Sequence, residues 1–400
     1  MSKPNSSEVS AQTAGGAAFG LTVTAGLSAI LVGLGLARFA FSPLQPALVG
    51  AGWFSAHVSA LLASANLVGY LAGSMLAAPL SHRFASTHLL RVTMFLVGLS
   101  FLAGYFQHYP LAWHFGWRFM SGLGGGMIMV LAGPLVVSQA KPEQRPLISQ
   151  VVLLGISMGI VMAGALMPIL LGNGVPATWL VLGGVALALT ACTWFMWPPA
   201  QVTVKSREGV KVRSGLFSLQ YALMAVGVVP QMVFLVDYIA RDLGLGVTAG
   251  SGFYLVYGLG AFLGPVLYGT ALRRASVRFI LRLAIGVQLA AVVLLIMTIK
   301  SASPHVLLVA SSGLAGLGMP GLVAIFLARS QQIGGGDALK AGVVWGRAIT
   351  AFSVGQALCG FATAHLIAVY GEQGLGYPVL FICSAVALIM ALLVDLRIRE

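Results

Sequence analysis

Arg38 is the residue of this chain best suited to bind a charged ligand. It lies well inside an apolar stretch, residues 21–49, that contains no acidic residue. A guanidinium in such a position costs about 2.5 to 3.5 kcal/mol on membrane-insertion scales, so it normally faces a cavity or a partner rather than lipid. Ser42 and Gln45 follow at i+4 and i+7, which places the three polar side chains on one face of a helix.

The next apolar stretch carries polar residues at a matching depth. Arg38 and Asn66 are each 14 residues from the centre of the expected first external turn, and Tyr70 follows Asn66 one turn deeper. We therefore predict that Arg38, Ser42, Gln45, Asn66 and Tyr70 bind a carboxylate or similar anion, with the guanidinium donating two parallel hydrogen bonds. The alternative is a structural Arg38 whose hydrogen bonds go to helix carbonyls.

Asp237 is the acidic residue of the second half that we expect inside the membrane region, and Arg241 follows one turn later. A plain i,i+4 ion pair at the external end of its apolar stretch is the simplest interpretation. A protonatable site or an external gate is the alternative, since carboxylates near hydrocarbon commonly carry protons. Pro230 frees a backbone carbonyl in the same stretch, so we expect Gln231 beside it to line the cavity.

Arg118 and Arg347 also lie within apolar stretches. Arg118 lies near the external end of its stretch beside His114 and Trp117, where snorkelling to the lipid headgroups is one interpretation. Arg347 lies near the cytoplasmic end of its stretch, where snorkelling or a gate contact is expected rather than a substrate contact.

The composition shows what must position these residues. With 58% hydrophobic and only 8% charged residues, the chain is expected to be an integral membrane protein of the all-α class rather than a soluble one. Twelve apolar stretches, most of at least the roughly 20 residues that a bilayer requires, predict twelve transmembrane helices. They lie near 21–49, 57–80, 89–107, 112–139, 148–171, 179–197, 215–240, 249–272, 279–300, 304–330, 341–370 and 377–396.

The basic residues predict the orientation. The net charge of +13 would indicate nucleic acid in a soluble protein, but 17 of the 22 Lys and Arg residues fall in cytoplasmic segments if the N-terminus is cytoplasmic. This positive-inside bias predicts both termini in the cytoplasm of a bacterial-type inner membrane and accounts for the basicity. No nucleic-acid partner is therefore expected.

Sparse features recur along the chain at a nearly constant shift. Gly69, Gly73 and Arg83 recur 191 residues later as Gly260, Gly264 and Arg274. Two parallel six-helix halves with a site between them are typical of secondary transporters. We expect a cytoplasmic tail at 1–20, one bundle at 21–197, a cytoplasmic linker at 198–214, a second bundle at 215–396 and a tail at 397–400.

These features resemble the major facilitator superfamily over about residues 20–396. Arg118-Phe-Met-Ser-Gly122-Leu-Gly124 resembles its Arg-x-x-x-Gly-x-Gly pattern, and Lys141-Pro-Glu-Gln-Arg145 resembles its short basic turn. Gly35-Leu-Ala-Arg38-Phe-Ala-Phe-Ser-Pro43-Leu-Gln-Pro46 and Gly355-Gln356-Ala-Leu are similar to the YbfB/YjiJ-type branch. The resemblance implies two pseudo-equivalent six-helix bundles and associates Arg118 with proton coupling.

The chain departs from the superfamily in the loop after the second helix, which usually carries Asp-Arg. Here it reads His82-Arg83, and the counterpart after the eighth helix reads Arg273-Arg274. Arg83 and Arg274 match the retained arginine and are gating candidates, together with Arg118, Asp237 and Arg347. In the superfamily this Asp commonly pins the cytoplasmic gate. Because the Asp is absent from both halves here, other residues must close that gate.

We therefore expect a non-enzymatic carrier, a monomer, that moves a small organic anion or zwitterion across the bilayer by alternating access. Protons are the expected coupling ion, and no cofactor or metal is expected. One alternative is a proton-driven efflux carrier for drugs or other hydrophobic compounds, although acidic residues that would attract lipophilic cations are nearly lacking. The other is a polytopic receptor without transport, for which the short loops leave no sensory domain.

Overall fold

The computed structural model describes residues 19–198, 212–301, 303–335, 337–371 and 373–398. Within these residues the fold is entirely helical, and twelve helices are long and apolar enough to cross a membrane, which confirms the predicted fold class. The expected tails at 1–20 and 397–400 and the linker at 198–214 lie largely outside the described residues. Most helix ends agree with the apolar stretches to within a few residues.

The third and sixth spans begin three and four residues earlier than the apolar stretches predict. The third begins with the polar turn Ser86-Thr87-His88, which an apolar count leaves out. The sixth begins directly after Gly174, whose φ of +91° ends the preceding segment, and has Pro176 in its first turn. Proline is favourable there because the first helical N–H groups have no intrahelical acceptor.

The first half consists of the first six spans. Its first span, Phe19–Gly50, contains a π-helical segment, η1, and a short α-helix, α2, so its hydrogen-bond pattern widens in the middle. The labelled elements of this half are η1 (Leu31–Phe39), α2 (Phe41–Gly50), α3 (Ala56–Ser81), α4 (Ser86–Gly104), α5 (Leu111–Ser138), η2 (Pro142–Gln144), α6 (Arg145–Gly172) and α7 (Val175–Thr193).

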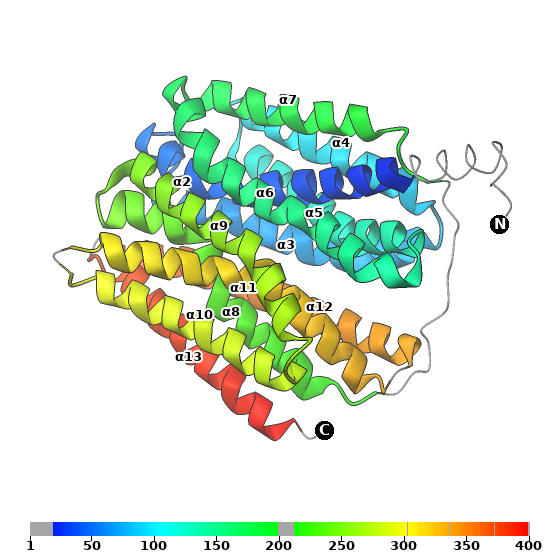
Figure 1. The fold of residues 1–400 in the computed structure, drawn as a ribbon. Coiled ribbons are helices and arrows are strands. Elements are labelled where there is room, and N and C mark those ends of the chain that lie inside the picture. The colour runs from blue at the N-terminus through cyan, green and yellow to red at the C-terminus, as the bar shows by residue number, and fades with distance from the viewer. Residues whose placement is uncertain (1–18, 199–211, 302, 336, 372, 399–400) are drawn as a thin grey trace, which may run out of the picture.

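The second half repeats this plan with six more spans. Its first span also contains a π-helical segment, η3, which here lies at the end of the span. The elements are α8 (Gly215–Asp237), η3 (Tyr238–Asp242), α9 (Gly246–Ala271), α10 (Val277–Thr298), α11 (His305–Ile333), α12 (Ala338–Tyr370) and α13 (Gly376–Arg397). In Figure 1 the two halves form neighbouring bundles, with α7 at one outer edge and α13 at the other.

The repeated glycines occupy equivalent helix contacts in the two halves. Gly73 in α3 faces the backbone of Leu123 in α5, and Gly264 in α9 faces the backbone of Leu317 in α11. These are the two most extensively packed helix pairs among the described residues. Because a side chain at either glycine would collide with backbone, the small residue is what lets these helices approach so closely.

The two halves touch mainly at one end of the bundles, which we name the closed end. There the Ser42 hydroxyl donates a hydrogen bond of 2.8 Å to Val233 O, and His57 Nδ1 lies 2.9 Å from Ala364 O. The α6–α9 pair continues this contact along the side. The described chain ends, near Phe19 and Ile398, lie at the opposite end, which we name the terminal end (Figure 1).

Candidate functional site

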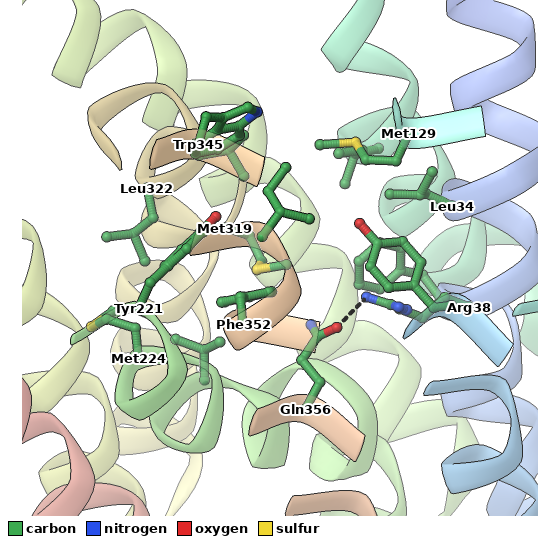
Figure 2. Close-up of a pocket in the computed structure, with 16 residues that line it drawn as sticks. Leu34, Arg38, Met129, Tyr221, Met224, Met319, Leu322, Trp345, Phe352 and Gln356 are labelled. Atoms are coloured by element: carbon green, nitrogen blue, oxygen red, sulfur yellow. Dashed lines mark hydrogen bonds between the residues drawn. The ribbon is translucent and has the colours of Figure 1, made fainter. Parts of the chain in front are cut away.

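A cavity lies between the two halves, on the terminal side of the contacts at the closed end. The space not filled by atoms amounts to roughly 650 Å³, of which part is open solvent at the mouth of the cavity. Helices of both halves contribute side chains to it (Figure 2). The lining residues are Leu34, Arg38, Phe39, Tyr70, Met129, Ile156, Tyr221, Met224, Val228, Met319, Leu322, Val323, Trp345, Ile349, Phe352 and Gln356.

Arg38 extends into this cavity from η1 and is only 7% exposed. Its Nη1 donates a long hydrogen bond of 3.4 Å to Gln356 Oε1 on α12, so the contact joins the two halves (Figure 2). Its guanidinium carbon lies 4.4 Å from the centre of the Tyr70 ring, a cation–π contact. Its Nη2 has no hydrogen-bond partner in the described part of the chain.

Gln356 carries a second free donor at the same place. Its side chain is fully buried, and while its Oε1 accepts from Arg38, its Nε2 has no partner among the described residues. Buried polar groups are nearly always hydrogen-bonded, so two neighbouring N–H groups without acceptors indicate a place for an acceptor group. No described carboxylate lines the cavity, so this acceptor would also neutralise the Arg38 charge.

The position of Arg38 is fixed by close packing behind it. Gly35 lies against the backbone of Gly155 and Gly159 in α6, with a Cβ at Gly35 only 2.8 Å from Gly155 O. On the other side, Arg118 Nη1 donates a 3.0 Å hydrogen bond to Ala37 O, directly before Arg38. A side chain at Gly35 would therefore push η1 and its arginine away from α6.

Arg118 itself does not line the cavity between the halves. It is 7% exposed, its guanidinium carbon lies 3.9 Å from the centre of the Phe41 ring, and its backbone carbonyl is 3.5 Å from Asn66 Nδ2. It lines a smaller pocket inside the first half, together with His114 and Trp179. Through its contacts with Ala37 and Phe41, Arg118 packs against the first span from inside the first half.

The structure brings Arg38 and Tyr70 of the predicted polar cluster together at the cavity, but places the other members in helix contacts. Ser42 bonds Val233 O across the halves, and Gln45 Nε2 lies 3.4 Å from Ser59 O in α3. Asn66 lies against the Arg118 carbonyl. In the second half, Gln231 Nε2 donates a 2.9 Å hydrogen bond to Ser311 Oγ. None of these four lines the cavity.

The remaining candidates lie away from the cavity. Asp237 is 2% exposed, accepts a 2.6 Å hydrogen bond from Arg241 Nε and also accepts from the Tyr377 hydroxyl. Arg347 is exposed and its Nη1 donates a 3.0 Å hydrogen bond to Val212 O. The Arg83 and Arg274 side chains are exposed at the terminal end.

Sequence reasoning missed the wall of the cavity that faces Arg38. Tyr221 of α8 stacks on Phe326 with ring centres 4.0 Å apart, and its ring centre lies 4.4 Å from that of Phe352 and 6.0 Å from that of Trp345. In the sequence, Gln356 stands out only as part of a stretch that is similar to the YbfB/YjiJ-type branch. Nothing in the local pattern separates these residues from ordinary core residues, because apolar and aromatic side chains fill every span.

The chain is similar to known transporters in sequence and in fold. A family model described as "Uncharacterised MFS-type transporter YbfB" matches residues 30–396, whereas no curated protein matches. A mutant of the nucleoside transporter NupG superposes with a TM-score of 0.76 at 11% identity, over 95% of this chain and 100% of that one. The D-xylose–proton symporter gives 0.73 at 14% identity, over 93% and 97%.

A bacterial homologue of the iron transporter ferroportin, in its outward-facing state, gives a TM-score of 0.66 at 17% identity over 94% of this chain and 98% of that one. At such low identity these three likenesses establish the fold alone.

Proposed function

Because this chain belongs to the YbfB-type family of the major facilitator superfamily, we propose that it carries a small organic anion across the membrane by alternating access, with Arg38 as the main substrate contact. Membership makes it a multi-pass membrane transporter rather than an enzyme. The anionic substrate is the further step, and it rests on the site between the halves.

One observation supports the anion most directly: Arg38 Nη2 and Gln356 Nε2 are buried donors without acceptors in the described chain. The two residues come from different halves and already touch through Arg38 Nη1 and Gln356 Oε1. A carboxylate offers two oxygens in a plane, which suits a guanidinium fork with an amide N–H beside it. Such a ligand would bind both halves at once, as alternating access about a central site requires.

The orientation that we propose places the terminal end in the cytoplasm, from the positive-inside bias. The cavity is then inward-facing, since its lining residues Tyr221 and Trp345 lie near the terminal ends of α8 and α12. Transport to the other side would have to break the Ser42–Val233 and His57–Ala364 contacts. Those four residues would therefore separate in the outward-facing state.

Protons remain the proposed coupling ion. Asp237 is the carboxylate that the sequence suggests for this role, but it is buried and accepts hydrogen bonds from both Arg241 and Tyr377. We therefore propose a mainly structural role for Asp237. Uptake into proteoliposomes, measured with and without an imposed pH gradient, tests both the direction of transport and its coupling to protons.

Efflux of hydrophobic compounds is the second candidate, because most of the cavity lining is apolar. A lipophilic cation, however, would meet the unneutralised Arg38 charge in a medium of low dielectric constant, where repulsion is strong. Arg38 variants separate the two proposals. Neutral or cationic drugs should bind as well or better when the positive charge is removed.

The direct test is binding and uptake of organic acids by purified protein carrying Arg38→Ala, Arg38→Lys or the exposed control Arg397→Ala. Loss of a charged contact in a dry site should cost roughly 2 to 5 kcal/mol, or about 30-fold to several thousand-fold in affinity. Arg38→Lys should retain part of the affinity, because it keeps the charge but not the planar fork. If Arg38→Ala bound organic acids normally, the efflux proposal would be favoured instead.

A further inference from the structure

The cavity has one strongly polar place, and the remainder of its lining is mostly apolar. Arg38 and Gln356 present their free donors together, near the Tyr70 ring. The described lining contains no Ser, Thr, Asn, His, Lys, Asp or Glu, and its other polar side-chain groups are the hydroxyls of Tyr70 and Tyr221 and the indole N–H of Trp345. A ligand that fills this space would therefore have one hydrogen-bonded, negatively charged end and a remainder that meets mainly carbon and sulfur atoms.

The wall opposite Arg38 is aromatic. Tyr221, Trp345 and Phe352 lie side by side from α8 and α12, and Phe326 supports Tyr221 from behind with ring planes only 20° apart. Figure 2 shows Tyr221 and Trp345 across the cavity from Arg38. Together these rings form an aromatic surface against which a ligand ring can pack.

Three methionines also line the cavity. Met129 comes from α5, Met224 from α8 and Met319 from α11, and all three line the cavity (Figure 2). An unbranched, polarisable methionine side chain adapts to the outline of a ligand and makes favourable contacts with ring edges. The lining thus favours an apolar body but does not require a single shape.

We propose that the substrates are amphipathic monoanions: organic acids with one carboxylate and an apolar, preferably aromatic, body. This inference rests on the proposed anion transport and adds the substrate class. The carboxylate would take the free donors of Arg38 and Gln356, while the body lies against the wall of Tyr221, Trp345 and Phe352. The carboxylate of the ligand then meets polar side chains, and its apolar body meets apolar ones.

The same lining selects against more polar acids. A second carboxylate or an ammonium group would enter the part of the cavity away from Arg38, where the described lining offers no opposite charge. A polar group buried without a partner costs free energy that the apolar lining does not return. Dicarboxylates and amino acids should therefore be poor substrates, even though each carries a carboxylate for Arg38.

The test is equilibrium binding to the purified full-length protein with matched probes. Phenylacetate and indole-3-acetate carry the carboxylate and a ring, acetate lacks the ring, phenylalanine adds an ammonium group, malate adds a carboxylate, and phenylacetamide lacks the charge. We expect the two aryl acids to bind at least about tenfold more tightly than each of the other four probes.

Variants assign each part of the ligand to its part of the cavity. Phe352→Leu should weaken phenylacetate binding about tenfold and leave acetate unchanged, whereas Arg38→Gln should weaken both. Phe361→Leu is the matched control, because Phe361 lies on the same helix but is 48% exposed on its outer surface.

The outcomes separate this inference from the proposed function. If acetate or malate binds as tightly as the aryl acids and depends on Arg38, anion transport stands but the apolar substrate class is wrong. If phenylacetamide binds as tightly as phenylacetate, or no acid binds in a manner that depends on Arg38, both proposals are wrong.

Discussion

Gly360 of α12 lies against Ser64 of α3 where the two halves meet at the closed end. A Cβ at Gly360 would be 2.9 Å from Ser64 Oγ and 2.9 Å from Leu67 Cδ1. The same helix pair carries the His57–Ala364 contact closer to the loops. A bulky side chain at residue 360 would therefore have no room while this end is closed.

Gly360→Trp should consequently hold the closed end open, because an indole cannot fit between α3 and α12 in the present arrangement. Spin labels placed on the loops of the two halves at this end should report a longer distance in the variant. Gly252→Trp is the control, since Gly252 lies near the closed end of α9 with nothing within 4 Å of its Cβ. An unchanged distance in Gly360→Trp would mean that the halves do not move apart here.

Asp237 should contribute more to stability than an exposed ion pair of the same spacing would. Asp237 is buried and bonded to both Arg241 and Tyr377, so Asp237→Asn should lower the free energy of unfolding by about 1 to 3 kcal/mol. Tyr377→Phe should cost less, because it removes one hydrogen bond and leaves the ion pair. Thermal unfolding of the two single variants and the double variant measures the coupling.

Transport distinguishes the structural role of Asp237 from a coupling role. If the role is structural, Asp237→Asn should retain uptake driven by a pH gradient, corrected for the amount of folded protein. Loss of gradient-driven uptake with retained substrate exchange would assign proton coupling to this carboxylate.

Gly122 in α5 and Gly316 in α11 give a prediction about the repeated packing. A Cβ at Gly122 would meet the backbone of Asn66, and one at Gly316 would meet the backbone of Tyr257. Each Ala substitution should destabilise the protein by about 1 to 3 kcal/mol through overpacking. Gly116→Ala, on the same helix as Gly122 with nothing within 4 Å, should have no such effect. Equal melting temperatures for Gly122→Ala and Gly116→Ala would contradict the close approach.

The orientation can be checked with reporter fusions. If the terminal end is cytoplasmic, fusions within the basic segment after Gly209 and at the C-terminus should report the cytoplasm, and fusions near Gly52 and Gly371 should report the outside. The opposite pattern would reverse the proposed inward-facing state.

The sequence predicts those features that depend on local physics. Twelve spans follow from apolar length, since a bilayer requires internally satisfied backbone over about 20 residues. The Asp237–Arg241 pair follows from i,i+4 spacing. The position of Arg38 deep in its apolar stretch, together with the cost of a guanidinium there, predicts that it faces either a cavity or helix carbonyls.

The rest of the site depends on distant helices and on the state of the molecule. Gln356 lies 318 residues from its partner Arg38, so no local pattern could pair them. Ser42 faces the second half, as its place on the polar face of the first helix predicts, but at a level where the halves touch, so it bonds Val233 O instead of lining the cavity. A polar residue on this face can line the cavity in one arrangement of the halves and contact the other half in another.

Arg118 supplies the last prediction, because its resemblance-based role in proton coupling and its observed contacts lead to different outcomes. Its hydrogen bond to Ala37 O and its position over Phe41 hold the segment that carries Arg38. We therefore expect Arg118→Gln to weaken substrate binding about tenfold at every pH by displacing Arg38, and Arg118→Lys to restore part of it. Binding is measured at several pH values, alongside exchange and gradient-driven uptake. Normal binding and exchange with loss of gradient-driven uptake alone would show that Arg118 couples protons rather than positions Arg38.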